Sequence, residues 1–231
     1  MHEWYAAPME GLTGWRWRQV QHEMFGRAAL YVTPFVSPNG NFSFQRKELE
    51  ELDPERNRGI PVVPQILTNR AEYFVWAAKE CRSRGWAQVD LNLGCPSGTV
   101  TGKKKGAGLL RQPELLRQLL DGIFDALPDM KISVKTRIGW ERAEEWPALL
   151  ALLETYPICR LTVHPRVRTQ FYKGTADREV FRWTAEHTAL PLCYNGDVTT
   201  VRDLWEMGEA FPDDAVMVGR GLVADPSLLR P

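Results

Sequence analysis

The chain has 231 residues, 44% of them hydrophobic, and its 29 basic residues balance 29 acidic ones, so the formal net charge is zero. This length suits one α/β barrel or two smaller domains, and the charge balance excludes a uniformly basic surface. The scattered cysteines form no CxxC pair and no histidines cluster, which argues against zinc and disulfides. Neither a signal peptide nor a membrane-length apolar run is present. We expect a cytoplasmic, monomeric protein with reduced thiols, no metal and no membrane contact.

Short apolar runs alternate with segments of helical periodicity along the whole chain. The apolar runs predict strands at residues 4–8, 30–35, 61–67, 88–93, 131–137, 160–164, 192–195 and 216–219. The periodic segments predict helices near residues 14–25, 70–84, 113–126, 143–156, 178–187 and 199–207. Asn69 is the expected cap of the helix at 70–84, Pro113 suits a first helical turn, and Thr199 and Thr200 precede another helix.

Eight strands with intervening helices predict an α/β fold of the TIM (β/α)8 barrel type. A doubly wound open sheet is the alternative. That fold places a GxGxxG turn after its first strand, whereas residues 7–11 read APMEG. The barrel is therefore the preferred fold.

The end of the chain differs from the rest of the pattern. Residues 225–231 barely begin a helix, so we expect the last outer helix to be missing or rudimentary and the chain to be truncated. The apolar residues there would then lack cover and form an exposed patch, namely Leu222, Val223, Leu228 and Leu229.

The segment 90–98, DLNLGCPSG, places a cysteine directly after a buried strand. Loops at that end of a parallel strand carry the chemistry of α/β enzymes. A structural cysteine would more often pack in mid-strand. Cys95 is therefore a candidate functional thiol.

Other polar groups follow the predicted strands, and in a barrel these ends meet at one mouth. The candidates are Pro8, Met9, Gln65, Asn92, Lys135, Arg137, His164, Arg166, Asn195-Gly196-Asp197 and Gly219-Arg220-Gly221. The last two groups follow strands seven and eight, where glycine-rich loops of barrels bind phosphate, and Arg220 adds a positive charge.

Three of these side chains allow a structural and a functional interpretation. Lys135 lies inside an apolar strand, where a buried ammonium needs a partner. It either pairs with a carboxylate such as Asp90 or Asp197, or faces an electron-rich cofactor such as the N1 and C2 carbonyl edge of a flavin. His164 could pack or cap, or hydrogen-bond a flavin or phosphate. Gln65 could bind a backbone edge or the N3–H and C4 carbonyl of a flavin.

Two basic patches flank the expected mouth. One is Lys103-Lys104-Lys105, and the other combines Arg166, Arg168 and Lys173 with the aromatic pair Phe171-Tyr172. Cations beside aromatics suit an RNA substrate with an exposed base. The lysine run is equally compatible with a solvated loop.

The chain resembles the tRNA-dihydrouridine synthases from its first predicted strand to its last. The resemblance rests on segments 7–13 (APMEGLT) with Arg18, 91–96 (LNLGCP), 106–110 (GAGLL), 134–139 (VKTRIG), 164–174 (HPRVRTQFYKG), 194–198 (YNGDV) and 217–221 (MVGRG).

The resemblance implies an FMN-binding TIM barrel over residues 1–231 that reduces uridine to 5,6-dihydrouridine in tRNA, using NADPH. It implies that Cys95 is the catalytic acid. The implied FMN-binding residues are Pro8, Met9, Gln65, Lys135, His164, Asn195, Gly196, Asp197, Gly219 and Arg220. The implied substrate-binding residues are Asn92, Arg137, Arg166 and Tyr172, to which the first basic patch adds Lys103 and Lys104.

This chemistry agrees with the residues present. A hydride adds to C6 of the uracil and a proton to C5, and a thiol of ordinary pKa is protonated at neutral pH. The uridine must leave its stack to reach the flavin, and NADPH is expected to use the same flavin face in turn. The family's C-terminal helical tRNA-binding domain is expected to be absent, while Gly14 and Pro165 depart from commoner family residues.

Three alternatives remain open. An FMN barrel could reduce a free pyrimidine or another small molecule. A non-catalytic fragment could bind tRNA without flavin. An inert fragment would hold no FMN.

Overall fold

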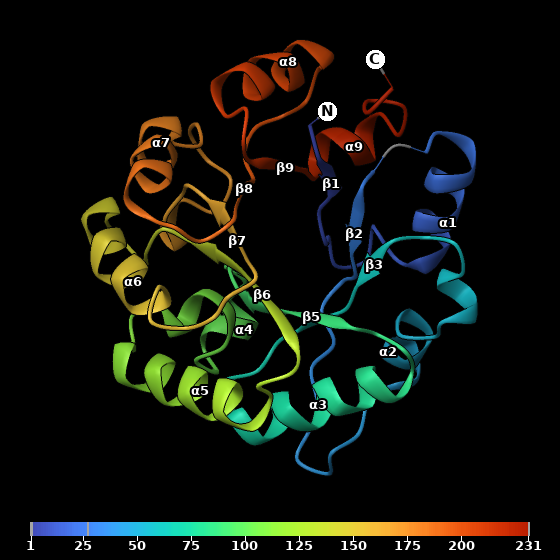
Figure 1. Cartoon of the computed structure of the whole chain (residues 1–231), viewed down its shortest axis with the longest axis vertical. Helices are drawn as coiled ribbons and strands as arrows, with labels where there is room; N and C mark the ends of the chain where they lie inside the picture. The colour runs from blue at the N-terminus through green and yellow to red at the C-terminus, as the bar shows by residue number, and fades with distance from the viewer. Residues whose placement is uncertain (1, 27, 231) are drawn as a thin grey trace.

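The computed structural model describes residues 2–26 and 28–230. Strands surround the centre and helices pack outside them (Figure 1). The strands are β1 (Trp4–Ala6), β2 (Leu30–Val32), β3 (Val62–Val63), β4 (Gln65–Ile66), β5 (Gln88–Leu93), β6 (Lys131–Arg137), β7 (Arg160–His164), β8 (Leu192–Tyr194) and β9 (Ala215–Val218). The α-helices are α1 (Trp15–Met24), α2 (Arg46–Glu51), α3 (Ala71–Ser83), α4 (Gly98–Thr101), α5 (Pro113–Ala126), α6 (Trp146–Leu153), α7 (Arg178–His187), α8 (Val201–Ala210) and α9 (Arg220–Ala224). The 3₁₀ turns are η1 (Glu55–Asn57), η2 (Gly106–Leu109), η3 (Ala143–Glu145) and η4 (Arg168–Gln170).

All strand pairs are parallel, in the order β3-β2-β1-β9-β8-β7-β6-β5-β4. The predicted third strand is interrupted at Pro64, which has no N–H to donate to a ladder. Its first half, β3, pairs with β2, and its second half, β4, pairs with β5. The Pro64 carbonyl accepts the N–H of Asp90, so the two halves close the sheet into a barrel. The predicted TIM barrel is therefore confirmed.

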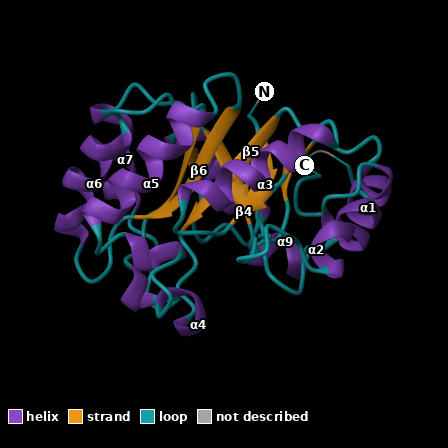
Figure 2. Ribbon diagram, turned by 90° about the horizontal axis from the view of Figure 1, so that it is seen from below, coloured by secondary structure: helices purple, strands orange, loops and turns teal. Residues whose placement is uncertain are grey.

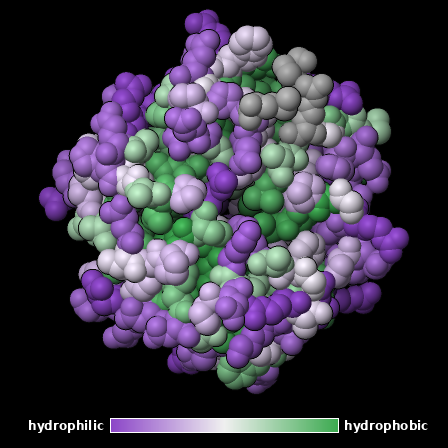
Figure 3. Space-filling model, in the orientation of Figure 1, coloured by the Kyte–Doolittle hydropathy of each residue, from purple (hydrophilic) through white to green (hydrophobic). Residues whose placement is uncertain are grey.

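Amphipathic helices cover the barrel because their apolar faces complete its core. On α5, Leu116, Leu119, Leu120 and Ile123 recur at helical spacing and are all buried. Polar side chains dominate the rim of the molecule in the view of Figure 3, and apolar ones show mainly nearer the middle. No helix within the described residues is long and apolar enough to span a bilayer.

Two predicted helix starts are confirmed and one is wrong. Pro113 is the first residue of α5, and the Thr200 hydroxyl caps α8 by accepting the N–H of Asp203. The cap position of α3 is Arg70, not Asn69. The Asn69 amide instead donates to the carbonyl of Lys103, because the loop that contains Lys103 folds back over it.

The expected apolar patch at the end of the chain is also wrong. Leu222, Leu228 and Leu229 are buried, and Val223 is half-buried. The short helix α9 and the turn after it pack against the barrel, and Gln21 donates from α1 to the carbonyl of Pro226. Arg230 adds bonds to the carbonyls at the end of α1. Pro231 lies outside the described residues.

Candidate active site

A cavity of about 270 Å³ opens at the C-terminal ends of the strands. Figure 2 places α4, which follows β5, on the side of the sheet away from the N-terminus. Most of the predicted site residues line this cavity: Pro8, Met9, Gln65, Asn92, Cys95, Lys135, Arg137, His164, Arg166, Tyr172, Asn195, Gly196, Gly219 and Arg220. Asp197, Lys103 and Lys104 do not line it.

Cys95 is half-buried in the loop after β5, and its backbone is held from two sides. Its N–H donates to Oδ1 of Asn92 at 2.9 Å, and its carbonyl accepts the N–H of Ala107 at 3.1 Å. Gly106 has φ +55°, and a Cβ there would lie 2.9 Å from the Cys95 carbonyl oxygen. Burial raises the pKa of the Cys95 thiol, although Arg137 and Lys135 act to lower it. The thiol is therefore protonated at neutral pH.

Lys135 lies on β6 and is half-buried in the cavity floor. Its Nζ donates to Oδ1 of Asn195 at 2.6 Å. Burial and the charge of Arg137 lower the pKa of Lys135 to about 8, against the opposing charge of Asp90. Within the described residues, no carboxylate lies within ion-pair distance of this ammonium. The ion-pair interpretation of Lys135 is thus wrong, because Asp90 and Asp197 bind other groups.

His164, at the end of β7, is buried beside several cations. Burial, followed by the charges of Arg137, Lys135 and Arg166, lowers the pKa of His164 well below 6.5, so the ring is neutral. Arg166 lies 3.0 Å from Nε2 of His164. Because a guanidinium can only donate, Nε2 accepts and the hydrogen resides on Nδ1. The ring can therefore donate one hydrogen bond to a ligand in the cavity.

Asp197 joins two arginines beneath the mouth. Its carboxylate accepts from Arg166 at 2.6 Å, from Arg220 at 2.9 Å and from the N–H of Ala176 at 2.9 Å. Partial burial acts to raise the pKa of Asp197, but these hydrogen bonds and charges hold it below the ordinary value. The Asp197 side chain thus orients Arg166 and Arg220, and only Arg220 of the two remains exposed.

Tyr172 stands at the mouth and is 52% exposed. The guanidinium carbon of Arg220 lies 4.9 Å from its ring centroid, and that of Arg137 lies 5.5 Å away. Arg137 is itself buried and donates to the carbonyls of Gly94 and Val167. It therefore ties the Cys95 loop to the loop after β7.

The first basic patch lies outside the cavity, on the segment that crosses from Cys95 to η2. Lys103 and Lys104 are exposed, whereas Nζ of Lys105 donates to the Ser37 hydroxyl at 3.1 Å. Arg168 contacts Thr101 of the same segment and stacks at 4.7 Å on Trp140. The loop is thus anchored at both sides, with two free lysines at its tip.

Comparison with known proteins gives this arrangement a family. A profile described as dihydrouridine synthase (Dus) matches residues 5–231. The chain belongs to the dihydrouridine synthase family. A probable tRNA-dihydrouridine synthase of Rhizobium leguminosarum bv. phaseoli is 33% identical over 221 residues, covering 95% of this chain and 68% of the relative. The tRNA-dihydrouridine synthase B of Proteus vulgaris is 30% identical over 226 residues, which cover 97% of this chain and 69% of the relative.

Solved structures share the fold of this family member at low identity. Histamine dehydrogenase from Rhizobium sp. 4-9 superposes with a TM-score of 0.72 and 13% identity over 98% of this chain and 45% of that one. A 2-naphthoyl-CoA reductase superposes with a TM-score of 0.69 and 13% identity, over 99% of this chain and 49% of the reductase. At these identities the likeness extends to the barrel alone.

Several cavity residues of this family member were not predicted from the sequence. They are Ala7, Glu10, Leu12, Pro34, Phe35, Gly94 and Pro96. Pro34 and Phe35 are the last two residues of the second predicted strand, 30–35, so the strand-end argument used for the other strands would have found them. Glu10 and Leu12 lie farther along their loop and carry no such signal.

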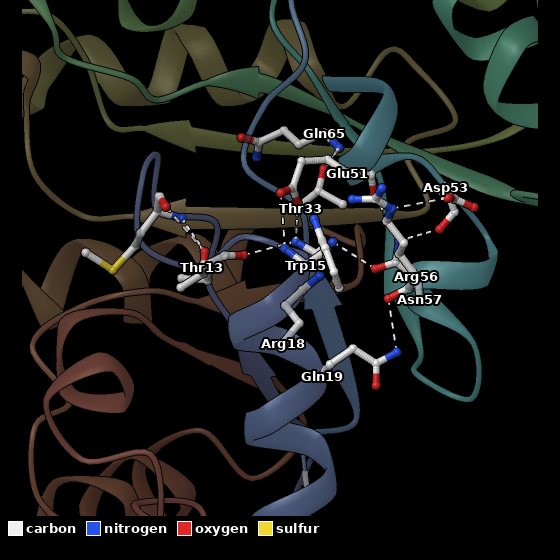
Figure 4. A network of polar contacts seen from close by, with 12 residues as sticks. Thr13, Trp15, Arg18, Gln19, Thr33, Glu51, Asp53, Arg56, Asn57 and Gln65 are labelled. Carbon is white, nitrogen blue, oxygen red and sulfur yellow. Dashed lines mark hydrogen bonds and ion pairs between the residues drawn. The ribbon is translucent and has the colours of Figure 1, made fainter. Parts of the chain in front are cut away.

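The loop after β1, which forms one wall of the cavity, depends on a buried arginine (Figure 4). Arg18 is fully buried and donates to the carbonyl of Thr13 at 3.0 Å, to Glu51 at 2.7 Å and to Oδ1 of Asn57 at 2.8 Å. The Thr13 hydroxyl accepts the N–H of Met9 at 2.8 Å. Arg18 thereby connects α2 and η1 to the cavity wall.

Proposed function

We propose that this protein reduces uridine to 5,6-dihydrouridine in tRNA, with bound FMN as cofactor and NADPH as reductant, and that the barrel is its FMN-binding catalytic domain. Membership of the dihydrouridine synthase family supports the reaction, as do relatives named tRNA-dihydrouridine synthase. The observation that carries the proposal is that the protonated Cys95 thiol and the Lys135 ammonium line the same cavity. We propose the cytoplasm, where tRNA and NADPH occur, as its location.

The residues of the cavity fit FMN. Lys135 uses one of its three hydrogens on Asn195, which leaves two for an electron-rich ring edge. The backbone N–H groups of Gly196, Asp197 and Arg220 have no acceptor among residues 2–26 and 28–230, and Arg220 adds an exposed charge beside them. Free N–H groups next to a cation suit a phosphate. We therefore assign the phosphate to these two loops and the ring edge to Lys135, Gln65 and His164.

FMN held by these residues would, once reduced, supply the hydride for C6 of the uracil. Cys95 then donates its thiol proton to C5, so the C5–C6 double bond gains two hydrogens, and the thiolate recovers a proton from water. The raised pKa of Cys95 keeps the thiol in the acid form that this step needs. The hydrogen bond from the Cys95 N–H to Asn92 and the close approach of Gly106 hold the backbone of Cys95 in place, and with it the base of the thiol side chain.

We assign substrate capture to the mouth. Tyr172 is an exposed ring with the guanidinium groups of Arg220 and Arg137 nearby, and a flipped-out base can stack on an exposed aromatic ring. Lys103 and Lys104 stand free at the loop tip, where they can approach RNA phosphates. Arg166 and Arg137 are too buried to reach the RNA phosphates. We therefore expect them to contact the substrate only inside the cavity.

The test is to incubate purified protein with FMN, NADPH and an unmodified tRNA transcript, and to map dihydrouridine by mass spectrometry. We expect a yellow protein that NADPH bleaches and tRNA re-oxidises. Cys95→Ala should keep the colour and the bleaching yet form almost no dihydrouridine. Cys159→Ser, at a half-buried cysteine that does not line the cavity, is the matched control and should behave as the wild type.

Other results would select other functions. Faster re-oxidation by free uracil than by tRNA would identify a small-molecule reductase. Binding of tRNA that persists without flavin and in Cys95→Ala, with no product from the wild type, would identify a non-catalytic binding module. Failure to bind FMN at all would reject the proposal.

A further inference from the structure

A buried carboxylic acid lies beneath the cavity floor, and no step above uses it. Asp90 is on β5 and 3% exposed. Its Oδ1 accepts from the Ser133 hydroxyl and its Oδ2 from Nε2 of Gln65, both at 2.7 Å. Strand register creates both contacts, because Asp90 is paired with Ser133 on β6 and with Gln65 on β4.

The chain of hydrogen bonds continues to the catalytic loop. Oε1 of Gln65 accepts from Nδ2 of Asn92 at 2.7 Å. Oδ1 of Asn92 accepts the N–H groups of Gly94 at 3.1 Å and Cys95 at 2.9 Å. An unbroken path of side chains therefore runs from Asp90 to the backbone of Cys95.

This path has one direction, and it is fixed from both ends. A carboxylate can only accept hydrogen bonds, so Gln65 must turn its amino group toward Asp90 and its carbonyl toward Asn92. At the other end, the backbone N–H groups of Gly94 and Cys95 can only donate, so Asn92 must turn its carbonyl toward them and its amino group toward Gln65. Asp90 is the one charged group of the path, and it anchors the end away from the loop.

We propose that Asp90 is a positioning residue, whose carboxylate anchors the outer end of this path and thereby holds in place the flavin-facing edge of Gln65 and the Asn92 carbonyl that binds the Cys95 loop. This inference rests on the proposed function for its flavin and its reaction. The spare N–H and spare carbonyl lone pair of Gln65 are what a flavin ring edge would meet.

The burial of Asp90 has an energetic cost. Desolvation raises the pKa of Asp90 to about 6, although the bonds from Ser133 and Gln65 and the charge of Lys135 act to lower it. The Cys159 thiol is the other titratable group that senses its charge. A neutral Asn avoids the desolvation cost of a buried charge, and it can accept from Gln65 with its oxygen while its amino group donates to the hydroxyl oxygen of Ser133. The variant Asp90→Asn should therefore fold, and its effects should appear in the site.

The first experiment compares Asp90→Asn with the wild type as FMN-loaded proteins. An asparagine presents a neutral oxygen to Gln65 in place of a carboxylate, so the path keeps its direction but loses the charge-assisted hydrogen bond that anchors it. We expect FMN to remain bound, the visible absorption band of the flavin to shift, and single-turnover oxidation by tRNA to slow by roughly 10-fold to 100-fold, the scale seen when an outer partner of a site residue is removed. The KM for tRNA should not change, because no tRNA contact is lost.

The second experiment follows the pH dependence of the flavin spectrum without tRNA. In the wild type, protonation of Asp90 removes the negative charge that Gln65 faces, so the band should shift with a midpoint near the pKa of about 6. The transition should be absent in Asp90→Asn. In Ser133→Ala it should move to higher pH, because the Ser133 hydrogen bond lowers the pKa of Asp90.

The third experiment needs neither flavin nor tRNA. In a Cys159→Ser background, the alkylation rate of Cys95 is measured in the apoprotein with iodoacetamide. The charges that act on the Cys95 thiol are those of Arg137, Glu10 and Lys135, and Asp90 in turn raises the pKa of Lys135. The rates are therefore compared in a Lys135→Met background, where a changed rate in Asp90→Asn reports the position of the loop. We expect alkylation to quicken, because Asn92, the acceptor of the loop N–H groups, is held less firmly through Gln65.

The proposal would be overturned if Asp90→Asn showed the same Cys95 alkylation rate as the wild type and the same flavin spectrum as the wild type at every pH. If Asp90→Asn does not fold, the wild type decides: a flavin spectrum of the wild-type protein that shows no transition near pH 6 would also overturn the proposal. A wild type that binds flavin and shows the pH transition, yet forms no dihydrouridine, would reject the proposed reaction and leave the role of Asp90 standing. If no FMN binds, the alkylation rates alone decide.

Discussion

Nζ of Lys135 donates to Oδ1 of Asn195 over 2.6 Å, across the gap between β6 and the loop after β8. The amide of Asn195 is fixed in turn, because its Nδ2 donates to the carbonyl of Met217 on β9 at 2.8 Å. The ammonium thus has one defined position, and its two other hydrogens are left for a ligand.

Lys135→Met is expected to weaken FMN binding and to make the midpoint potential of the bound flavin more negative, because a cation beside the ring stabilises the anionic reduced form. In the wild type, FMN affinity should fall as the pH rises through about 8, where the free protein loses the ammonium charge. Fluorescence titration of FMN at several pH values measures this. Lys131→Met, at the exposed start of the same strand, is the control. A pH dependence that survives in Lys135→Met would assign it to another group.

The Cys95 thiol predicts an alkaline limit to activity. An acid works only while it is protonated, and burial raises the pKa of this thiol. With FMN kept saturating, so that the loss of the Lys135 charge near pH 8 does not empty the site, turnover should hold through neutral pH and fall only above the ordinary range of a cysteine. Removing the acid with Cys95→Ala should lower kcat by roughly 100-fold to 10,000-fold. Initial rates of dihydrouridine formation across pH give both results, and a decline that begins near pH 7 would contradict the first.

Gly106→Ala should separate catalysis from cofactor binding. The new Cβ would lie 2.9 Å from the carbonyl oxygen and 3.1 Å from Cβ of Cys95, in a backbone conformation that alanine adopts at a cost. We expect the Cys95 loop to shift and turnover to drop while the affinity for FMN is retained. Gly98→Ala is the matched change in the same segment, because its Cβ would meet no atom within 4 Å. Equal turnover by Gly106→Ala and Gly98→Ala would show that the position of the Cys95 loop does not limit catalysis.

Arg18→Met should destabilise the protein by roughly 3–5 kcal/mol, because it leaves the Glu51 carboxylate and the Asn57 amide without their buried partner. Urea unfolding followed by circular dichroism measures the loss. The exposed pair of Arg46 with Glu50 provides the comparison, and Arg46→Met should cost about 1 kcal/mol or less. The double variant Arg18→Met with Glu51→Leu should recover part of the loss, since the unpaired charge is gone.

The sequence predicts strands best where burial is uninterrupted. The bounds of β5, β6 and β7 are those expected, because each begins at a polar residue and continues through buried apolar positions. The helix α2 was not predicted, because Arg46–Glu51 is charged and short. It is stabilised by a capping box between Gln45 and Glu48 and by the contact of Glu51 with buried Arg18. Such tertiary support leaves no periodicity to detect.

The same limit applies to the site. Its members could be predicted because strand ends in a barrel converge on one mouth. Their partners could not, because partners depend on register. Asp90 could be considered from the sequence as a partner of Lys135, yet pairing across β4, β5 and β6 places it against Gln65 and Ser133 instead. A slip of one residue would turn each of these side chains to the other face.

The barrel closes through its first and last strands, where Trp4 pairs with Val216 and Ala6 with Val218. During synthesis the N-terminal strand leaves the ribosome long before its neighbour exists, and contacts so distant in sequence form slowly. Gly219 and Arg220 directly follow the late strand. The loops that we assign to the FMN phosphate are thus the last part of the pocket to be made, so we expect a nascent chain to bind flavin only after its closing strand has emerged.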